Sequence, residues 1–184
     1  QGNFIGVDVT GTKPLGNAFS GVSLAAHQNF IGGDAAGAGN VIAASTNGFG
    51  IDVDQGDNST IQGNFIGTDV TGTIPLGNFL GGLSLNGGGI LVGGTAGGEG
   101  NVIAFNGGYG VRVDTGTGNA IVNNSIFSNG LLGIDLLPGG LTPNDAGDTD
   151  TGANTLINWP VLSSARTAGA NVLVQVALSP TPLG

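Results

Sequence analysis

Two segments of this chain, residues 2–17 and 63–78, are nearly the same sixteen residues written twice, 61 positions apart. They read GNFIGVDVTGTKPLGN and GNFIGTDVTGTIPLGN, and they differ only at Val7/Thr68 and Lys13/Ile74. A chain that repeats itself at a fixed period is built from stacked units, so the repeat restricts the fold more than any other feature of the sequence. A period of about 60 residues is too long for one supersecondary unit, which indicates a finer repeat inside it.

Two short signatures supply that finer repeat. The pattern Gly-apolar-x-apolar begins at Gly21, Gly50, Gly82, Gly110 and Gly133. The pattern Asn-x-Ile begins at Asn3, Asn40, Asn64, Asn101 and Asn124. Units of 20–30 residues with three short strands are typical of a parallel β-helix, so the 61-residue period is two coils, each with its own insertion. Asparagines at the same turn of successive coils can hydrogen-bond to one another, and these five are predicted to form a ladder.

The composition agrees with a strand-rich solenoid. Glycine occurs 39 times, charged residues make up 8% of the chain, and strong helix formers are scarce, which disfavours helix. Hydrophobic residues make up 39% of the chain, which excludes an intrinsically disordered segment. A net charge of −9 argues against nucleic acid and anionic membrane as partners, and no apolar run approaches the roughly 20 residues that span a bilayer.

Three regions are expected along the chain. Residues 1–137 carry the coil signatures, residues 138–160 are an acidic Gly/Pro-rich loop region, and residues 161–184 form a terminal strand that caps the coils or begins another domain. In each strand alternate residues face the core, so Arg112 faces outward. The residues expected in the core by this alternation are Ile51, Val53, Leu83, Leu85, Val111, Val113, Ile134 and Leu136.

The coil signature together with NAIVNNSIFSNGLLGIDL, residues 119–136, resembles the right-handed parallel β-helix repeat regions of large secreted and cell-surface bacterial proteins. The tail NDAGDTDTGANTLINWPVL, residues 144–162, is similar to the segment that closes such regions before a β-sandwich. The resemblance implies an all-β, right-handed parallel β-helix of about five coils with a non-helical C-terminal segment. It also implies an extracellular, non-catalytic structural or adhesive segment whose partners are neighbouring domains or further copies in a filament.

A glycan-processing enzyme is the alternative function. Strand alternation puts Ser23, Asp52, Ser84, Arg112 and Asp135 in one exposed column, and Ala25, Asp54, Asn86, Asp114 and Leu137 in the next. Asp54 and Asp114 lie two coils apart, so their carboxyl groups are expected roughly 9–10 Å apart, near the separation of inverting glycosidases. Arg112 is expected to pair with Asp135. A glycan-binding module, with a polysaccharide as partner and Trp159 and Tyr109 as stacking platforms, is the third reading.

Calcium is the one cofactor that the sequence suggests. Asp145, Asp148 and Asp150 place carboxylates at short intervals before Gly152, as calcium-binding loops do, although an acidic linker has the same composition. His27 is the only histidine, so neither a zinc site nor a Ser-His-Asp triad with supporting ligands is available, and His27 is expected in a turn or on the surface.

Overall fold

The computed structural model describes residues 1–177, and within them the chain is built from short strands and turns. Regular helix in this range is limited to one short 3₁₀ segment, η1 (Ala153–Leu156). The strands are β1 (Phe4–Ile5), β2 (Val22–Leu24), β3 (Phe30–Gly32), β4 (Val41–Ile42), β5 (Phe49–Val53), β6 (Thr60–Gln62), β7 (Phe65–Ile66), β8 (Gly81–Asn86), β9 (Leu91–Gly93), β10 (Val102–Ala104), β11 (Tyr109–Thr115), β12 (Ala120–Val122), β13 (Ser125–Phe127), β14 (Ile134–Leu136), β15 (Val161–Ala168) and β16 (Asn171–Ala177).

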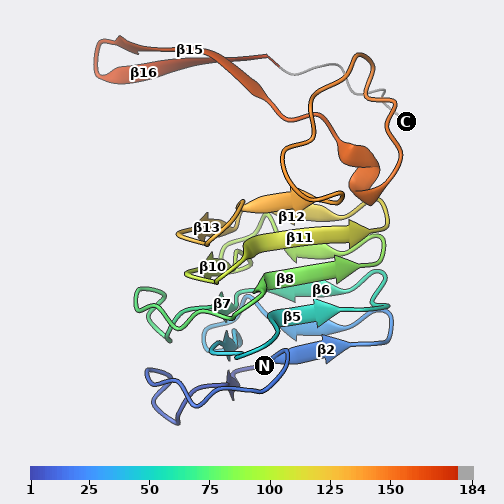
Figure 1. The fold of residues 1–184 in the computed structure, drawn as a ribbon. Coiled ribbons are helices and arrows are strands. Elements are labelled where there is room, and N and C mark those ends of the chain that lie inside the picture. The colour runs from blue at the N-terminus through green and yellow to red at the C-terminus, as the bar shows by residue number, and fades with distance from the viewer. Residues whose placement is uncertain (178–184) are drawn as a thin grey trace.

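Three parallel sheets stack the chain upon itself (Figure 1). The first sheet has the order β1-β4-β7-β10-β13, the second β2-β5-β8-β11-β14 and the third β3-β6-β9-β12. Each sheet takes every third strand, so we call three consecutive strands, one in each sheet, a rung. The all-β, stacked parallel arrangement predicted from the repeats is therefore confirmed, and it is consistent with a β-helix-like solenoid.

The core is a set of columns in which like residues lie over one another. Ile5, Ile42, Ile66, Ile103 and Ile126 are successive partners in the first sheet. In the second sheet, Ile51, Leu83 and Val111 are partners in the same way, and all three are fully buried. Burying each such side chain stabilises the fold by roughly 1.5–3 kcal/mol.

Ile134 departs from the expected core. It pairs with Val111 in the predicted register, yet it is exposed, whereas its neighbour Asp135 is buried. The reason is that β14 is the last strand of its sheet, so no further rung covers the apolar side of Ile134. The prediction that Ile134 belongs to the buried core is wrong for this reason.

The asparagines of the Asn-x-Ile triplets lie in one continuous ladder. The side-chain oxygen of Asn64 accepts hydrogen bonds from the backbone N–H and the side-chain N–H of Asn40, at 3.1 and 2.8 Å. Asn64 donates in the same two ways to the side-chain oxygen of Asn101, at 2.9 Å each. The same pair of bonds joins Asn3 to Asn40 and Asn101 to Asn124. The ladder therefore satisfies a corner N–H group at every step along the stack.

Two further amide ladders occupy the other corners. Asn78 donates to Asn106, and Asn106 to Asn129, with the same backbone and side-chain pairing. At the third corner, the Asn119 side-chain oxygen accepts from the Ile90 N–H, and the backbone N–H of Asn119 donates to the side-chain oxygen of Asn154 in η1. Sequence inspection could have found the second ladder, because each of its asparagines precedes the glycine of a Gly-apolar-x-apolar signature by four residues.

The twin insertions 7–16 and 68–77 close on a buried or half-buried aspartate. The Asp69 carboxylate accepts hydrogen bonds from the Thr71 hydroxyl and from the N–H groups of Thr73 and Ile74. Those bonds outweigh the effect of burial and hold the pKa of Asp69 below its ordinary value. The Val70 N–H donates to the Gly11 carbonyl at 3.0 Å, so the two loops also bond to each other.

The C-terminal segment differs from the expected single strand. Residues 161–177 form an antiparallel hairpin, β15 and β16, that projects from the end of the stack. Gly169, with a φ of 63°, provides the tight turn between the strands, which the sequence interpretation did not recognise. The rest of the expected terminal strand, beyond residue 177, lies outside the described residues. The hairpin does not cover the end of the solenoid, whereas η1 does so in part through Asn154.

Replacing Asn64 with alanine is expected to destabilise the protein by roughly 2–5 kcal/mol, because it leaves several buried N–H and C=O groups without a partner. Chemical denaturation measures the change. Asn47→Ala is the matched control, since Asn47 is exposed and outside the ladders, and it should change stability by about 0.5 kcal/mol or less. Equal losses in the two variants would contradict a structural role for the ladder.

Candidate functional site

The outer face of the second sheet brings together most of the polar side chains singled out from the sequence. Asp52 on β5, Ser84 on β8, Arg112 on β11 and Asp135 on β14 are successive register partners, as the alternation predicts. Ser84 and Asp135 are buried, so the prediction that the whole column is exposed is wrong. This face looks toward the viewer in Figure 1. Asp54, which directly follows β5, and Asp114 on β11 are close enough to Asp52 to influence its charge.

Asp114 is held by two neighbours. Its carboxylate forms an ion pair with Arg112, in which Nε lies 2.6 Å from Oδ1 and Nη2 donates to Oδ2 at 3.1 Å. The Ser84 hydroxyl donates to Oδ2 at 2.6 Å. The Arg112 guanidinium also lies 4.8 Å from the centre of the Phe49 ring, a cation–π contact. Both oxygens of the Asp114 carboxylate therefore have partners, and these contacts fix the position of the side chain.

The expected pairing of Arg112 with Asp135 is wrong. Arg112 turns instead to Asp114, two residues along its own strand. Asp135 is 2% exposed because the turn after β14 covers it, and its Oδ1 accepts the Gly140 N–H at 2.9 Å. The other oxygen, Oδ2, is buried and has no hydrogen-bond partner within residues 1–177.

A β-bulge alters the second predicted column. Val113 pairs with Leu85 and Thr115 with Asn86, so Asp114 has no residue opposite it. The predicted column that aligned Asn86 with Asp114 is therefore displaced by one residue at this point. An extra residue in a strand bends it locally and re-aims the side chain, which accounts for the contact of Asp114 with Ser84 and Arg112.

Asp52 is a carboxyl group on this face with an altered pKa. Burial raises its pKa above the ordinary value of 3.8, and the negative charges of Asp54 and Asp114 raise it further. The Ser84 hydroxyl and the Arg112 charge act in the opposite direction without cancelling the effect. An acid with a raised pKa beside an ionised carboxylate is the arrangement that a general acid requires, although a catalytic role needs a bound substrate as well.

Two carboxylates of the predicted calcium loop accept hydrogen bonds from residues of the same C-terminal segment. Asp145 Oδ2 accepts from the Thr149 N–H and hydroxyl, and Asp148 Oδ1 accepts the Asn158 N–H at 2.9 Å. Residues 1–177 contain no group of three or more His, Cys, Asp or Glu side chains placed to hold a metal. Calcium binding at Asp145, Asp148 and Asp150 stays a prediction from the sequence.

Trp159 forms one wall of a cavity at the end of the stack. The cavity has a volume of about 370 Å³ and lies between β14 and the segment that follows it. Leu132, Ile134 and Leu156 contribute apolar walls, and the Trp159 indole N–H donates to the Thr142 carbonyl at 2.8 Å. Tyr109, the other expected stacking platform, lies on β11 and does not line this cavity.

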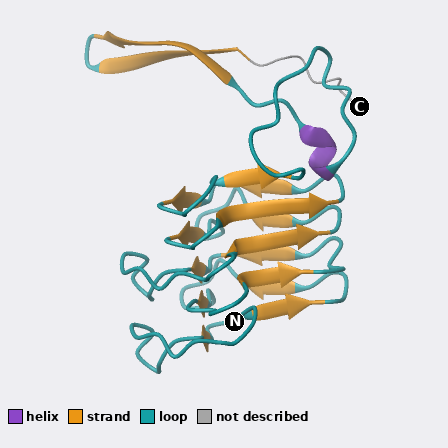
Figure 2. Cartoon of the chain, in the orientation of Figure 1, coloured by secondary structure: helices purple, strands orange, loops and turns teal. Residues whose placement is uncertain are grey.

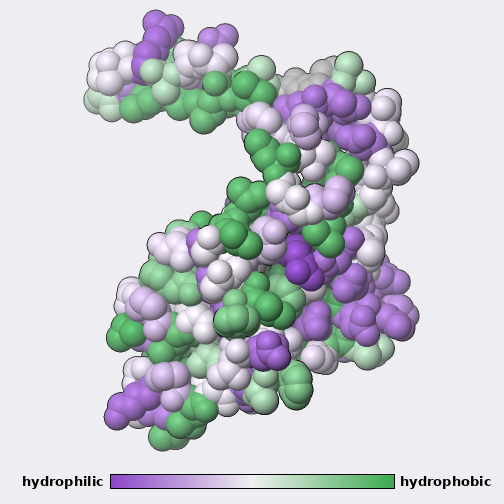
Figure 3. All heavy atoms as spheres, in the orientation of Figure 1, coloured by the Kyte–Doolittle hydropathy of each residue, from purple (hydrophilic) through white to green (hydrophobic). Residues whose placement is uncertain are grey.

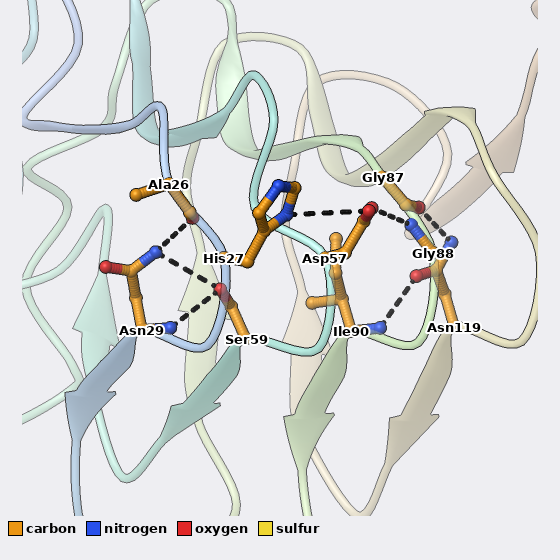
Figure 4. A network of polar contacts seen from close by, with 9 residues as sticks. All are labelled: Ala26, His27, Asn29, Asp57, Ser59, Gly87, Gly88, Ile90 and Asn119. Carbon is orange, nitrogen blue, oxygen red and sulfur yellow. Dashed lines mark hydrogen bonds and ion pairs between the residues drawn. The ribbon is translucent and has the colours of Figure 1, made fainter.

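His27 belongs to a surface network at the third corner (Figure 4). Its Nδ1 lies 3.5 Å from Asp57 Oδ2, and Asp57 Oδ1 accepts the Gly88 N–H at 2.8 Å. Both His27 and Asp57 are exposed, so the pair contributes little to stability. Below them in the same view, the Ser59 hydroxyl accepts the Asn29 N–H, which continues the corner bonding in a rung that lacks an asparagine.

Asp52→Asn is expected to raise the unfolding temperature near neutral pH, where the wild-type carboxylate is ionised in a partly buried position. A raised native pKa means that the native state takes up the proton first, so the wild type recovers stability as the pH falls through that pKa. The difference between the proteins should shrink from about pH 7 to about pH 3, as thermal unfolding will show. Asp34→Asn, in an exposed loop, controls for the loss of one negative charge; the same pH-dependent difference in that control would contradict the interpretation.

Comparison with protein-family models, with curated proteins and with solved structures finds no match to this chain. Residues 1–177 contain no helix that is long and apolar enough to cross a membrane.

Proposed function

We propose that the chain is a right-handed parallel β-helix of about five coils that serves as a non-catalytic structural or adhesive segment of a larger extracellular bacterial protein. One observation carries the proposal. The first amide ladder runs without a break from Asn3 to Asn124. These corner asparagines are the most regular polar residues of the chain, and their side chains hydrogen-bond one rung to the next.

The state of the polar outer face supports the same function. Asp114, one of the two carboxylates that the sequence offered as a catalytic pair, receives hydrogen bonds from Ser84 and Arg112. Arg112, in turn, is occupied by Asp114 and by the Phe49 ring. These contacts tie three strands of the second sheet together from outside, which is a stiffening role. The resemblance to bacterial surface repeats supplies the extracellular setting of the proposal.

A glycan-processing enzyme is the second candidate, and the raised pKa of Asp52 favours it. In that function Asp52 is the proton donor to the leaving oxygen and Asp54, beside it, the partner carboxylate. This assignment replaces the pair Asp54 and Asp114, because Asp114 is engaged by Arg112. A polysaccharide lying across the outer face of the second sheet is then the substrate.

Limited proteolysis with a protease of broad specificity tests the structural function. We expect the stacked rungs, residues 1–137, to survive as one resistant fragment, while the hairpin β15–β16, whose residues are all exposed, is removed. The reason is that cleavage inside a rung requires several buried hydrogen bonds to open together. Rapid cutting at many sites within residues 1–137 would contradict a stiff segment.

A reducing-sugar assay on a panel of polysaccharides separates the two functions. We expect no release of reducing ends by the wild-type protein. Release that is lost in Asp52→Asn and in Asp54→Asn, but kept in Asp34→Asn, would establish the enzyme and overturn the non-catalytic proposal. The three variants remove one charge each, so their comparison controls for net charge.

A further inference from the structure

Four asparagines of the chain are followed directly by glycine, and they stand in different surroundings. They are Asn47, Asn86, Asn106 and Asn129. The side-chain carbon of such an asparagine is open to attack by the next backbone nitrogen, because glycine has no side chain to hinder ring closure. Polar residues are scattered over the face of the stack in Figure 3, so exposure alone singles out no site. The four pairs differ in what the amide and the following N–H group bond to.

Asn47 lies in the turn between β4 and β5, and its amide is held by nothing. The residue is exposed, and its side chain forms no hydrogen bond within residues 1–177. In the same range the Gly48 N–H donates to no other group. The residues just before it are anchored, since the Ser45 N–H donates to the Asn78 side chain at 3.0 Å and the Thr46 N–H bonds to the neighbouring rung. Both groups that ring closure joins are therefore free at this pair.

The stacking of the rungs imposes the glycine of this pair. A Cβ atom at Gly48 would lie 2.3 Å from the Ser20 nitrogen and 2.6 Å from the Phe19 carbonyl carbon, both in the preceding rung. The Gly48 carbonyl accepts the Leu80 N–H at 3.0 Å, which joins it to the following rung. A larger residue at this position would displace the backbone. The fold therefore requires the glycine, whereas no contact requires the asparagine before it.

Asn106 and Asn129 belong to the second amide ladder, and their reacting groups are occupied. The Asn106 side-chain oxygen accepts from the backbone and side-chain N–H groups of Asn78, at 3.1 and 2.9 Å. The Gly107 N–H donates to the Asn78 carbonyl at 2.9 Å, and the Gly130 N–H to the Asn106 carbonyl at 2.8 Å. Ring closure at either asparagine would break several hydrogen bonds between rungs, which opposes the reaction.

Asn86 is intermediate between these two cases. It is the half-buried last residue of β8, and its side-chain oxygen lies 3.5 Å from the Thr115 hydroxyl. The carbonyl of the following residue, Gly87, accepts from the Asn119 side chain at 3.0 Å. Ring closure here must turn the end of a strand that lies between β5 and β11 in its sheet. We therefore expect it to be slower than at Asn47.

We propose that Asn47 is a site of spontaneous deamidation, and that it is the first of the four asparagines to be modified. The Gly48 nitrogen forms a bond to Cγ of Asn47, the Cγ–Nδ2 bond breaks, and the Gly48 N–H proton leaves with Nδ2 as ammonia. Water then opens the resulting succinimide ring at either carbonyl carbon, which gives an aspartate or an isoaspartyl linkage. The inference rests on the geometry of this turn and does not depend on the proposed extracellular function.

The two products change the turn in different ways. Each adds a negative charge at position 47, in a segment, residues 35–51, that contains no charged residue. The isoaspartyl linkage also lengthens the backbone by a carbon atom between β4 and β5. Because the Gly48 carbonyl accepts the Leu80 N–H, the longer backbone is expected to disturb the alignment of two rungs and to lower the unfolding temperature.

Mass spectrometry of protein incubated in a mildly alkaline buffer tests the proposal. In the folded protein we expect Asn47 to lose its amide roughly tenfold or more faster than Asn106 and Asn129, whose ladder bonds must open first. The same chain in concentrated urea is the matched control. With the ladders undone, the four asparagine–glycine pairs should react within about threefold of one another.

Asn47→Gln should abolish the fast step and leave the slower sites unchanged, and circular dichroism checks that this exposed position tolerates the change. A folded protein in which Asn106 or Asn129 reacts as fast as Asn47, or in which Asn86 reacts first, overturns the proposal. So does an Asn47 amide that persists in the folded protein for the time in which the chain in urea reacts completely. A fast step that survives in Asn47→Gln has the same consequence.

Discussion

The pairing of each corner asparagine with the next is the interaction on which the rest of this structure depends. A chain that turns three times per rung leaves N–H groups at every corner pointing along the stack, where no strand partner reaches them. An asparagine supplies an oxygen to the rung before it and an N–H to the rung after it, as Asn64 does between Asn40 and Asn101. These hydrogen bonds repeat only if the asparagines of successive rungs lie directly over one another. The ladder therefore enforces the strand register that also stacks the isoleucine column.

That constraint divides the chain into positions that are fixed and positions that are free. Corner asparagines, core aliphatic side chains and the glycines of crowded turns are restricted to few residue types, whereas residues between them are limited only by the space outside the stack. The insertions 7–16 and 68–77 extend outward from the stack, and the side chains of Phe19 and Phe79 are exposed on the same alternate rungs. The 61-residue repeat of the sequence is therefore also the period of the molecular surface, and surface features of one kind recur two rungs apart.

The sequence predicted the elements that depend on periodicity and failed where periodicity ends. The ladder of Asn3 to Asn124 and the column of Asp52 to Asp135 follow from counting residues between signatures. The Arg112–Asp114 pair depends on a one-residue bulge, which no spacing reveals. Ile134 and Asp135 were misjudged because the last strand of a sheet has a neighbour on one side only, so alternation no longer decides what is covered. The β15–β16 turn at Gly169 was hidden in a segment without repeats.

The polar and the apolar surfaces of the stack differ in how many of their side chains already have a partner within the chain. On the outer face of the second sheet, Arg112, Asp114 and Ser84 already satisfy one another, so a ligand there must compete with an ion pair and hydrogen bonds that are in place. Phe19, Phe79 and Leu131, which precede β2, β8 and β14, leave apolar surface in contact with water, and covering that surface breaks no bond within the chain. The polar face carries the residue types from which enzymes are built, yet three of its side chains already bind one another.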